Sequence, residues 1–190
     1  GIGVAVAAVA SGAARADGLP VLGIDDGSTG VTVPGSTYRF VTVPANRDTL
    51  VARVQRRGGR IAGARLLPGK FTVPAVAYDG SAGGLSADGR VLALIEPRVS
   101  FPRHETTFAV LATRSFLLQR LARLRGDFSF DAVSPTGDRL FLIQYLSPRD
   151  PTRYAVRAYD VRSGRLLHAP IVDPRDREQM HGRPVSRAMS

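Results

Sequence analysis

The stretch that decides the fold is residues 128–167, FSFDAVSPTGDRLFLIQYLSPRDPTRYAVRAYDVRSGRLL. Its first seven residues alternate with a period of two, which is typical of a β-strand. A Pro-Thr-Gly-Asp turn at 135–138 follows, because Pro presets φ and Gly accepts a positive φ. An apolar run at 140–143, an alternating run at 154–160 and a Ser-Gly break before a last short strand complete the pattern. Together these features predict four short strands in one up-and-down sheet.

Looser copies of this pattern occur upstream. Residues 85–94 match 133–142 with a one-residue difference in the turn, and residues 108–113 match 154–159. The earliest copy consists of strands at 38–43 and 50–55 and an Arg-Gly-Gly-Arg turn at 57–60. Serines 86, 134 and 190 recur at intervals of 134 − 86 = 48 and 190 − 134 = 56 residues. Four-stranded repeats of about 40 to 50 residues are typical of β-propeller blades.

The turn motif itself appears as SADGR at 86–90 and as SPTGDR at 134–139. A strand ending in Ser, then Pro-Asp-Gly or a variant, then a basic residue and an apolar strand, resembles the repeat of bacterial extracytoplasmic β-propellers of the YVTN and TolB-like type. The resemblance covers residues 29–190 and implies an all-β, WD40-like propeller of four-stranded antiparallel blades, although the chain has no Trp and lacks the WD signature. It implies no particular activity, because propellers have many functions. A β-sandwich of similar strands is the alternative fold.

The copies divide residues 17–190 into blades. We expect blades at 30–67, 71–124 and 128–172, a further blade beginning at 184–190, and a glycine-rich insert at 80–84 within the second. A closed propeller has at least about four blades, so we expect an open arc that is a fragment of a longer protein. We interpret the apolar residues 21–24 as a latch strand that completes the last blade.

One segment is ambiguous. Residues 116–124 have apolar side chains at helical spacing and a basic opposite face, which alone would indicate a cationic amphipathic helix on a membrane surface. Within the repeat the same residues are the outer strand of the second blade. We predict the strand, because the neighbouring strands fix the context.

The N-terminal residues indicate export. Residues 2–9 are an apolar run of small residues, and Ala14-x-Ala16 fits a signal-peptidase site, so residues 1–16 are interpreted as the end of a secretory signal peptide. A short buried strand or helix is the alternative.

The chain has no Cys, which excludes disulfides, thiol catalysis and thiolate metal sites. Its net charge is 26 − 16 = +10, and Lys70 is the only lysine. No nucleic-acid recognition motif is present.

The most plausible ligand-binding surface is the end of the blades that carries the longer loops. We place there a set of charged and His side chains as possible binding residues: Arg103, His104, Glu105, Arg149, Asp150, Arg175, Glu178 and His181. The opposite end carries more positive charge, which a solvated Arg-rich surface or binding to an acidic envelope polymer or anionic lipid would explain.

No pattern in the chain supports specific chemistry. There is no H-E-x-x-H, no calcium loop, no phosphate fingerprint and no G-x-S-x-G. We therefore assign no catalytic, cofactor-binding or metal-ligating residue. The predicted function is a non-catalytic, exported binding or scaffold module of the cell envelope. The alternatives are a metal-dependent propeller lactonase or hydrolase completed by further blades, and a cationic membrane-surface protein.

Overall fold

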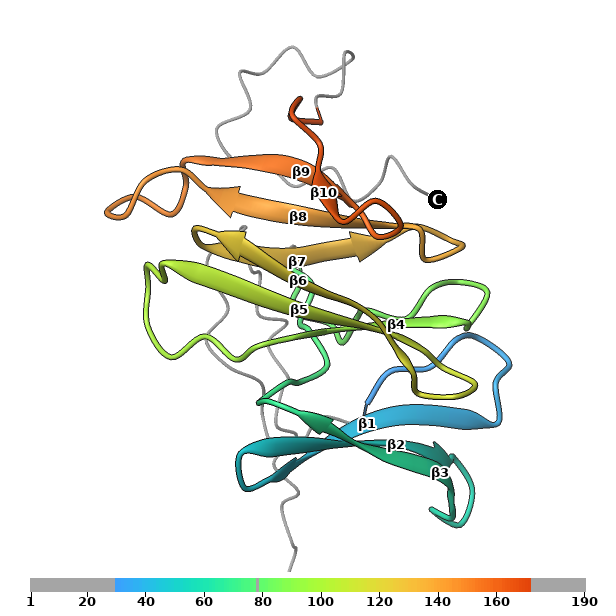
Figure 1. The fold of residues 1–190 in the computed structure, drawn as a ribbon. Helices are drawn as coiled ribbons and strands as arrows, with labels where there is room; N and C mark the ends of the chain where they lie inside the picture. The colour runs from blue at the N-terminus through green and yellow to red at the C-terminus, as the bar shows by residue number, and fades with distance from the viewer. Residues whose placement is uncertain (1–29, 78, 172–190) are drawn as a thin grey trace, which may run out of the picture.

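The computed structural model describes residues 30–77 and 79–171, which form three antiparallel β-sheets and no helix (Figure 1). Within each sheet, strands that follow one another in the chain are hydrogen-bonded neighbours, so the chain runs up and down. The sheets consist of β1 (Tyr38–Ala45), β2 (Asp48–Gln55) and β3 (Ile61–Pro68); β4 (Val91–Ile95), β5 (Glu105–Ala112) and β6 (Leu118–Arg125); and β7 (Phe128–Val133), β8 (Arg139–Tyr145), β9 (Tyr154–Asp160) and β10 (Arg165–Leu166).

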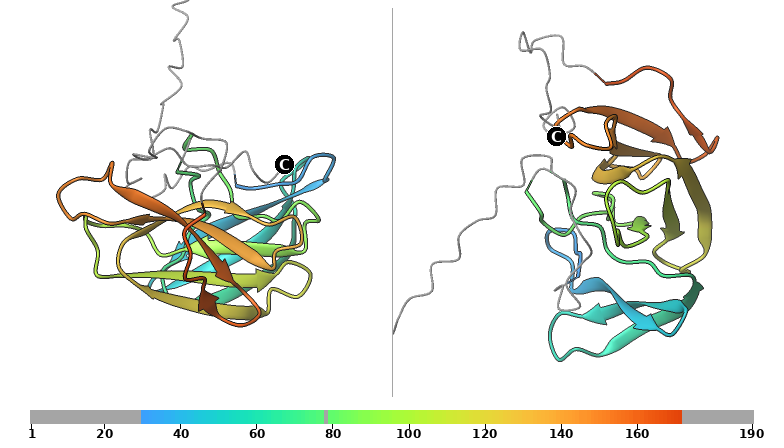
Figure 2. Two further views of the ribbon diagram at one scale, coloured as in Figure 1. Left: turned by 90° about the horizontal axis from the view of Figure 1, so that it is seen from above. Right: turned by 90° about the vertical axis from the view of Figure 1, so that its left-hand side faces the viewer.

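The three sheets follow one another along an arc, as the blades of a propeller do (Figures 1 and 2). The described residues do not close this arc into a ring. The prediction of an all-β, open blade arrangement is confirmed, and the two-sheet sandwich is wrong because three sheets stand in series.

The blades are held together by apolar side chains between their faces. One cluster lies between the first and second blades: Val31, Phe40, Val51, Leu67, Phe71, Val73, Leu92, Leu94, Ala109, Leu111 and Phe116. A second lies between the second and third blades: Val91, Ala93, Phe108, Val110, Ala122, Leu124, Phe128, Phe130, Leu140, Leu142, Tyr159 and Val161. Each blade therefore buries its apolar residues against its neighbour and cannot form a core alone, as in repeat architectures generally.

The innermost strand is complete only in the third blade. In the first blade it is reduced to the bridge between Val31 and Phe40, because Pro34 soon follows and cannot donate to a ladder. In the second blade it is split into bridges at Thr72 and Leu85, with the excursion 74–84 between them. The expectation of four strands per blade is thus met by one full sheet and by two sheets whose inner strand is only bridged.

The repeated serine turns share one hydrogen-bond arrangement. The Ser86 hydroxyl donates to the Asp88 carboxylate at 2.6 Å and accepts from the Val91 amide at 3.0 Å. The Ser134 hydroxyl likewise donates to Asp138 and accepts from the Arg139 amide at 2.9 Å. Both serines are buried. Their prediction as turn residues is confirmed. In both turns the hydroxyl accepts from the amide five residues later, so the turns have the same length and the predicted one-residue difference is wrong. What differs is the position of the acidic residue, two residues after Ser86 and four after Ser134.

The links between blades also repeat. The Thr49 hydroxyl donates to the Gly69 carbonyl at 2.8 Å and accepts from the Phe71 amide at 2.7 Å. In the next blade the Thr106 hydroxyl donates to the carbonyl of residue 126 at 2.8 Å and accepts from the Phe128 amide at 3.0 Å. A buried threonine thus satisfies the backbone groups that the sheet ladder leaves unpaired where the chain crosses between blades.

The ambiguous segment is a strand. β6 pairs with β5 from Glu105 to Leu111, so the outer-strand prediction is confirmed and the amphipathic helix is wrong. Pairing along the whole of β5 outweighs the helical spacing of its apolar residues. No helix in the described part of the chain could cross a membrane. The signal peptide at 1–16, the latch at 21–24 and the further blade at 184–190 lie outside the described residues.

Candidate binding face and the buried charge cluster beneath it

The ends of the blades define two faces. We call the end that carries the segments 45–48, 68–70, 96–104, 125–127 and 146–153 the loop face, and the opposite end, which carries the short turns, the turn face. The right-hand view of Figure 2 looks onto the loop face. Strand register fixes this arrangement, because the pairs Ala45–Asp48, Glu105–Arg125 and Tyr145–Tyr154 all lie at the same end of their sheets.

A buried cluster of charges lies beneath the loop face between the second and third blades. The Arg98 guanidinium donates to one oxygen of Asp127 through Nε at 3.1 Å and Nη2 at 2.5 Å. The Arg103 amide donates to the other Asp127 oxygen at 3.0 Å, and its Nε lies 3.3 Å from the first. The Arg98 and Asp127 side chains are only 3% and 2% exposed. One carboxylate thus holds both ends of the loop.

The cluster holds two guanidinium groups and one carboxylate. Burial, together with the charge of Arg98, lowers the pKa of Arg103 to about 10. Arg103 is therefore still protonated at neutral pH. Part of the missing negative charge is replaced by carbonyl dipoles, since Arg103 donates to the carbonyls of Glu96 and Phe128, and Arg98 also donates to that of Phe128 at 3.2 Å. These bonds close the loop 96–104 upon itself and onto β7.

An aromatic contact extends the cluster to the third blade. The Arg98 guanidinium lies over the Tyr145 ring at 5.4 Å, and the Tyr145 hydroxyl lies 3.1 Å from that of Ser129, which accepts from Arg98. The Phe101 ring packs edge-on against Tyr145 at 5.4 Å. Burial raises the pKa of Tyr145, so the phenol stays protonated. The loop of the second blade is thereby fixed to the end of β8.

The corresponding junction between the first and second blades lacks this cluster. Lys70 occupies the position equivalent to Asp127, between Gly69 and Phe71, and it is exposed. The preceding connection, from Ala45 to Asp48, is a tight turn that offers no counterpart of the Arg98 loop. The fold can therefore join two blades without buried charges, and the cluster belongs to this particular loop.

The structure places the predicted binding residues unevenly. Arg103 is half-buried in the cluster, whereas His104 and Glu105 are exposed beside it. Arg149 is exposed and Asp150 half-buried in the neighbouring loop 146–153, where the Asp150 carboxylate accepts from the Thr152 amide at 3.0 Å. The Phe101–Tyr145 contact brings the two loops together. The remaining predicted residues lie outside the described part of the chain: Arg175, Glu178 and His181.

A second buried acidic group lies in the innermost strand β7. Asp131 is 2% exposed and sits at the register shift between Phe130 and Ala132, so this strand bulges there and its alternation breaks. Within the described part of the chain neither of its carboxylate oxygens has a hydrogen-bond partner. Burial, with a smaller contribution from the charge of Asp79, raises the pKa of Asp131 to about 6.

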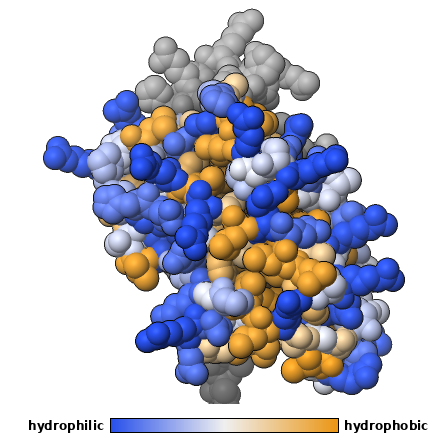
Figure 3. Space-filling view, in the orientation of Figure 1, coloured by the Kyte–Doolittle hydropathy of each residue, from blue (hydrophilic) through white to orange (hydrophobic). Residues whose placement is uncertain are grey.

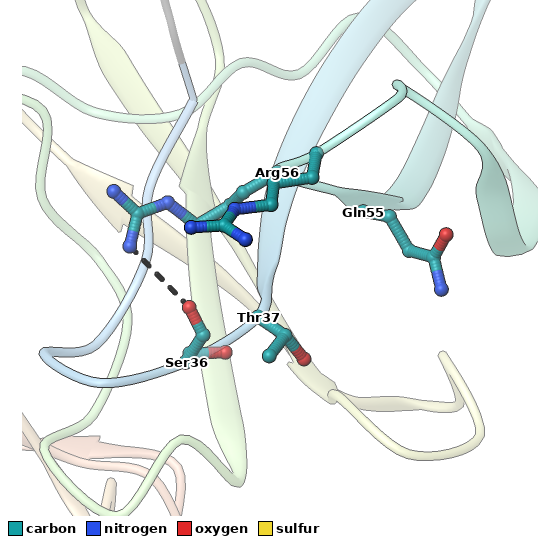
Figure 4. Close-up of a pocket in the computed structure, with 5 residues that line it drawn as sticks. Ser36, Thr37, Gln55 and Arg56 are labelled. Carbon is teal, nitrogen blue, oxygen red and sulfur yellow. Dashed lines mark hydrogen bonds between the residues drawn. The ribbon is translucent and has the colours of Figure 1, made fainter.

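A recess of about 600 Å³ lies on the turn face of the first blade. Its lining consists of Ser36, Thr37, Gln55, Arg56 and Arg57. Figure 4 shows the Arg56 guanidinium reaching over the backbone of Ser36, to whose carbonyl it donates at 3.3 Å. The volume falls within the range of about 300 to 1,000 Å³ that is usual for small-ligand sites.

In the described ranges, 30–77 and 79–171, no group of three or more His, Asp or Glu side chains lies close enough together to hold a metal ion. The prediction placed no metal ligands, and the buried residues Arg98, Asp127 and Asp131 were not among its candidates. The sequence gives little signal for them, because Asp127 lies between Gly and Phe as Lys70 does in the first junction, and Asp131 fits the alternation of residues 128–134.

Comparisons with known proteins give a distant likeness only. No family model and no curated protein matches the chain. Among solved structures, an uncharacterised protein of Listeria monocytogenes superposes with a TM-score of 0.49 at 12% identity, over 77% of this chain and 44% of that one. The β-propeller domain of the trilobed protease of Pyrococcus furiosus gives 0.40 at 11% identity, over 73% and 40%. Hydrazine synthase of Kuenenia stuttgartiensis gives 0.30 at 16%, over 79% and 53%. The chain spans about half the length of each.

Proposed function

We propose that this chain is part of an exported, non-catalytic β-propeller of the YVTN and TolB-like type, and that it binds a protein partner of the cell envelope through its loop face. The observation that supports this most is the buried cluster of Arg98, Arg103 and Asp127. Charges are costly to bury, and a buried ion pair seldom stabilises a fold more than apolar residues of the same size would. Because the equivalent junction joins its two blades without such a cluster, joining blades does not explain why these charges are buried here.

The cluster instead fixes the conformation of the loop 96–104. Ordering a loop during binding costs free energy, so a loop held in place beforehand binds more tightly. The segment 96–104 is fixed at Arg98, Phe101 and Arg103, yet its Val99 side chain is 94% exposed. Leu146 of the adjacent loop is 57% exposed. The loop face also exposes Arg125, Arg149 and Arg153 against Glu96 and Glu105. Two apolar side chains on such a surface suit a protein with a complementary apolar site and an acidic rim.

Export rests on residues 1–16 as a signal peptide. The Ala14-x-Ala16 site would give a mature protein beginning at Asp17. N-terminal sequencing of the protein from its native cell tests this. A mature protein that begins at Asp17 is expected, and one that retains residues 1–16 would contradict export.

Site-specific photo-crosslinking in the native organism tests the binding face. We expect a photoreactive residue at Val99 to give one discrete protein adduct, and the same residue at the exposed Arg123 of β6 to give none. The adduct should weaken when Asp127→Asn releases the loop. Equal adducts from both positions, or none from Val99, would contradict the proposal.

A second candidate function, a metal-dependent propeller lactonase or hydrolase, is favoured by Asp131. An unpartnered buried carboxylate on an innermost strand is a plausible metal ligand. The remaining ligands would come from outside the described residues. Thermal unfolding with Ca²⁺, Zn²⁺ or EDTA distinguishes the two functions, since a ligand stabilises only the state that binds it. A metal-dependent rise in Tm that Asp131→Asn abolishes would favour the enzyme; equal Tm values in all three solutions would favour the binding module.

A further inference from the structure

The turn face carries an unusual density of positive charge. Its arginines lie in or beside the short turns of all three blades, and every one of them is exposed: Arg56, Arg57, Arg60, Arg90, Arg114, Arg139, Arg162 and Arg165. Figure 3 shows hydrophilic side chains projecting along the right-hand edge of the molecule, which is the end where β7 turns into β8 in Figure 1.

The carboxylates of this face are already engaged in their own turns. Asp88 accepts from the Ser86 hydroxyl and the Arg90 amide, and Asp138 accepts from the Ser134 and Thr136 hydroxyls. Asp160 accepts from the Ser163 amide at 2.6 Å. These bonds lower the pKa of Asp138 and of Asp160, so both carboxylates stay ionised but are directed into the turns. The closest ion pair on the face, Arg90 with Asp88, spans 3.9 Å and is exposed, so it neutralises little.

Hydrogen bonds connect the turns of the second and third blades into one platform. The Asp88 amide donates to the Pro135 carbonyl at 3.1 Å, which joins the turns of the second and third blades. The Val161 amide donates to the Asp138 carbonyl at 2.9 Å, and the Arg120 guanidinium reaches across from β6 to the Val161 carbonyl at 3.0 Å. These links fix the arginines of the second and third blades relative to one another. The positive charges of these two blades are therefore held in a fixed arrangement.

The recess of the first blade lies on the same face. There Arg56 and Arg57 stand beside the hydroxyls of Ser36 and Thr37 and the amide of Gln55. Guanidinium groups pair with carboxylates or sulfates, while hydroxyls and an amide exchange hydrogen bonds with hydroxyl groups. A recess lined in this way fits a unit that carries an anionic group and hydroxyls together. An acidic sugar has that chemistry.

We infer that the turn face binds an acidic polysaccharide, with one acidic sugar unit in the recess and neighbouring units along the arginine platform. A chain is favoured over a membrane because most exposed positions of the turns carry Arg or small, polar or proline side chains, and apolar ones are few. Interfacial binding needs apolar side chains projecting among the charges. The exposed apolar side chains at this end are confined to the starts of the outer strands β3 and β6: Ile61, Leu117 and Leu118. This face lies opposite the loop face, so the inference is independent of the proposed protein partner.

Binding of the full chain to polygalacturonate, measured by calorimetry, tests the inference. We expect saturable binding that weakens roughly tenfold or more between 50 and 200 mM NaCl, because several ion contacts release counterions. The recess variant Arg56→Gln/Arg57→Gln should weaken binding at least about fivefold, since it removes the paired guanidinium groups. The matched control Arg149→Gln/Arg153→Gln removes the same charge from the loop face and should change binding less than about twofold. Circular dichroism checks that both variants fold.

Four outcomes would overturn it. Equal loss of affinity in the two variants would mean that only the total charge matters. Equal affinity for polyglutamate, which has carboxylates but no sugar hydroxyls, would remove the role of the recess. Binding to vesicles with 30% phosphatidylglycerol but not to polygalacturonate would assign the face to a membrane. Neutral dextran should not bind, and binding of dextran equal to that of polygalacturonate would also contradict the inference.

Discussion

We predict that the buried carboxyl of Asp131 makes this protein less stable at neutral pH than at mildly acidic pH. In an unfolded chain an Asp carboxyl has a pKa near 3.8, whereas burial raises the pKa of the folded Asp131 to about 6. Between these values the folded state holds a proton that the unfolded state has released. Raising the pH through this interval therefore favours unfolding. At about 1.4 kcal/mol per pH unit, the ionised Asp131 lowers the free energy of unfolding above pH 6 by at most about 3 kcal/mol.

The substitution Asp131→Asn removes this charge while keeping the size of the side chain. The buried amide would itself lack partners, which costs about 1 to 2 kcal/mol. We therefore expect the variant to be more stable than the wild type by about 1 to 2 kcal/mol at pH 7.5, and equal or less stable at pH 4.5. Urea unfolding followed by circular dichroism at pH 4.5, 6.0 and 7.5 measures both.

The comparison must be made between the two proteins at each pH. Asp138 and Asp160 have lowered pKa values, so their contributions to stability are present at a pH above the ordinary pKa of Asp and are lost as the pH falls below it. They act in the opposite direction to Asp131 and are present in both proteins. A difference between variant and wild type that stays constant from pH 4.5 to 7.5 would refute a buried, unpartnered Asp131.

Three further substitutions test the contacts that join the blades, each by urea unfolding. Arg98→Met leaves Asp127 buried without its main partner and should cost about 3 kcal/mol or more; a cost below about 1 kcal/mol would show that the pair is solvated. Thr106→Val removes the hydroxyl that serves two backbone groups and should cost about 2 to 3 kcal/mol, so a neutral result would contradict the link geometry. Gly137→Ala places a Cβ 2.4 Å from Val91 at a φ of 78°, whereas Gly35→Ala at a φ of 77° meets no neighbouring atom. Gly137→Ala should therefore destabilise the protein clearly more than Gly35→Ala, for which a loss of about 1 kcal/mol is expected. Equal losses of stability in the two variants would mean that the turn of the third blade does not pack on the second blade.

The strands of the third blade could be predicted because their information is local. The alternating run 154–160 is β9 with the same bounds. Ser134 has its predicted role in the turn at 135–138, since its hydroxyl accepts from the Arg139 amide. The repeat also settled the ambiguous segment, since β6 takes its conformation from pairing with β5 and not from its own periodicity. Local pattern and repetition therefore account for the blades and their order.

The buried charges could not be predicted, because they depend on contacts between distant residues. Arg98 and Asp127 are separated by 29 residues, and nothing in either neighbourhood indicates the other. Arg103 was a candidate as an exposed loop residue, yet it is half-buried and helps to hold the loop. Asp131 fits the alternating pattern of its strand, and only the bulge and the burial of the inner strand reveal its unusual environment. Site chemistry here is a product of blade packing.

The most direct test of a pre-formed loop face is amide hydrogen exchange in the wild-type protein, resolved by residue. The Arg103 amide donates to Asp127 at 3.0 Å, and the Gly126 amide donates to the His104 carbonyl at 2.7 Å. We expect both to exchange about as slowly as the Phe71 amide, which donates to buried Thr49 in the other junction. Asp127→Asn should accelerate exchange at Arg103 and leave Phe71 unchanged. Free exchange at Arg103 and Gly126 in the wild type would show that the loop is not held in place, and would contradict the proposal that the loop face is a pre-formed binding surface.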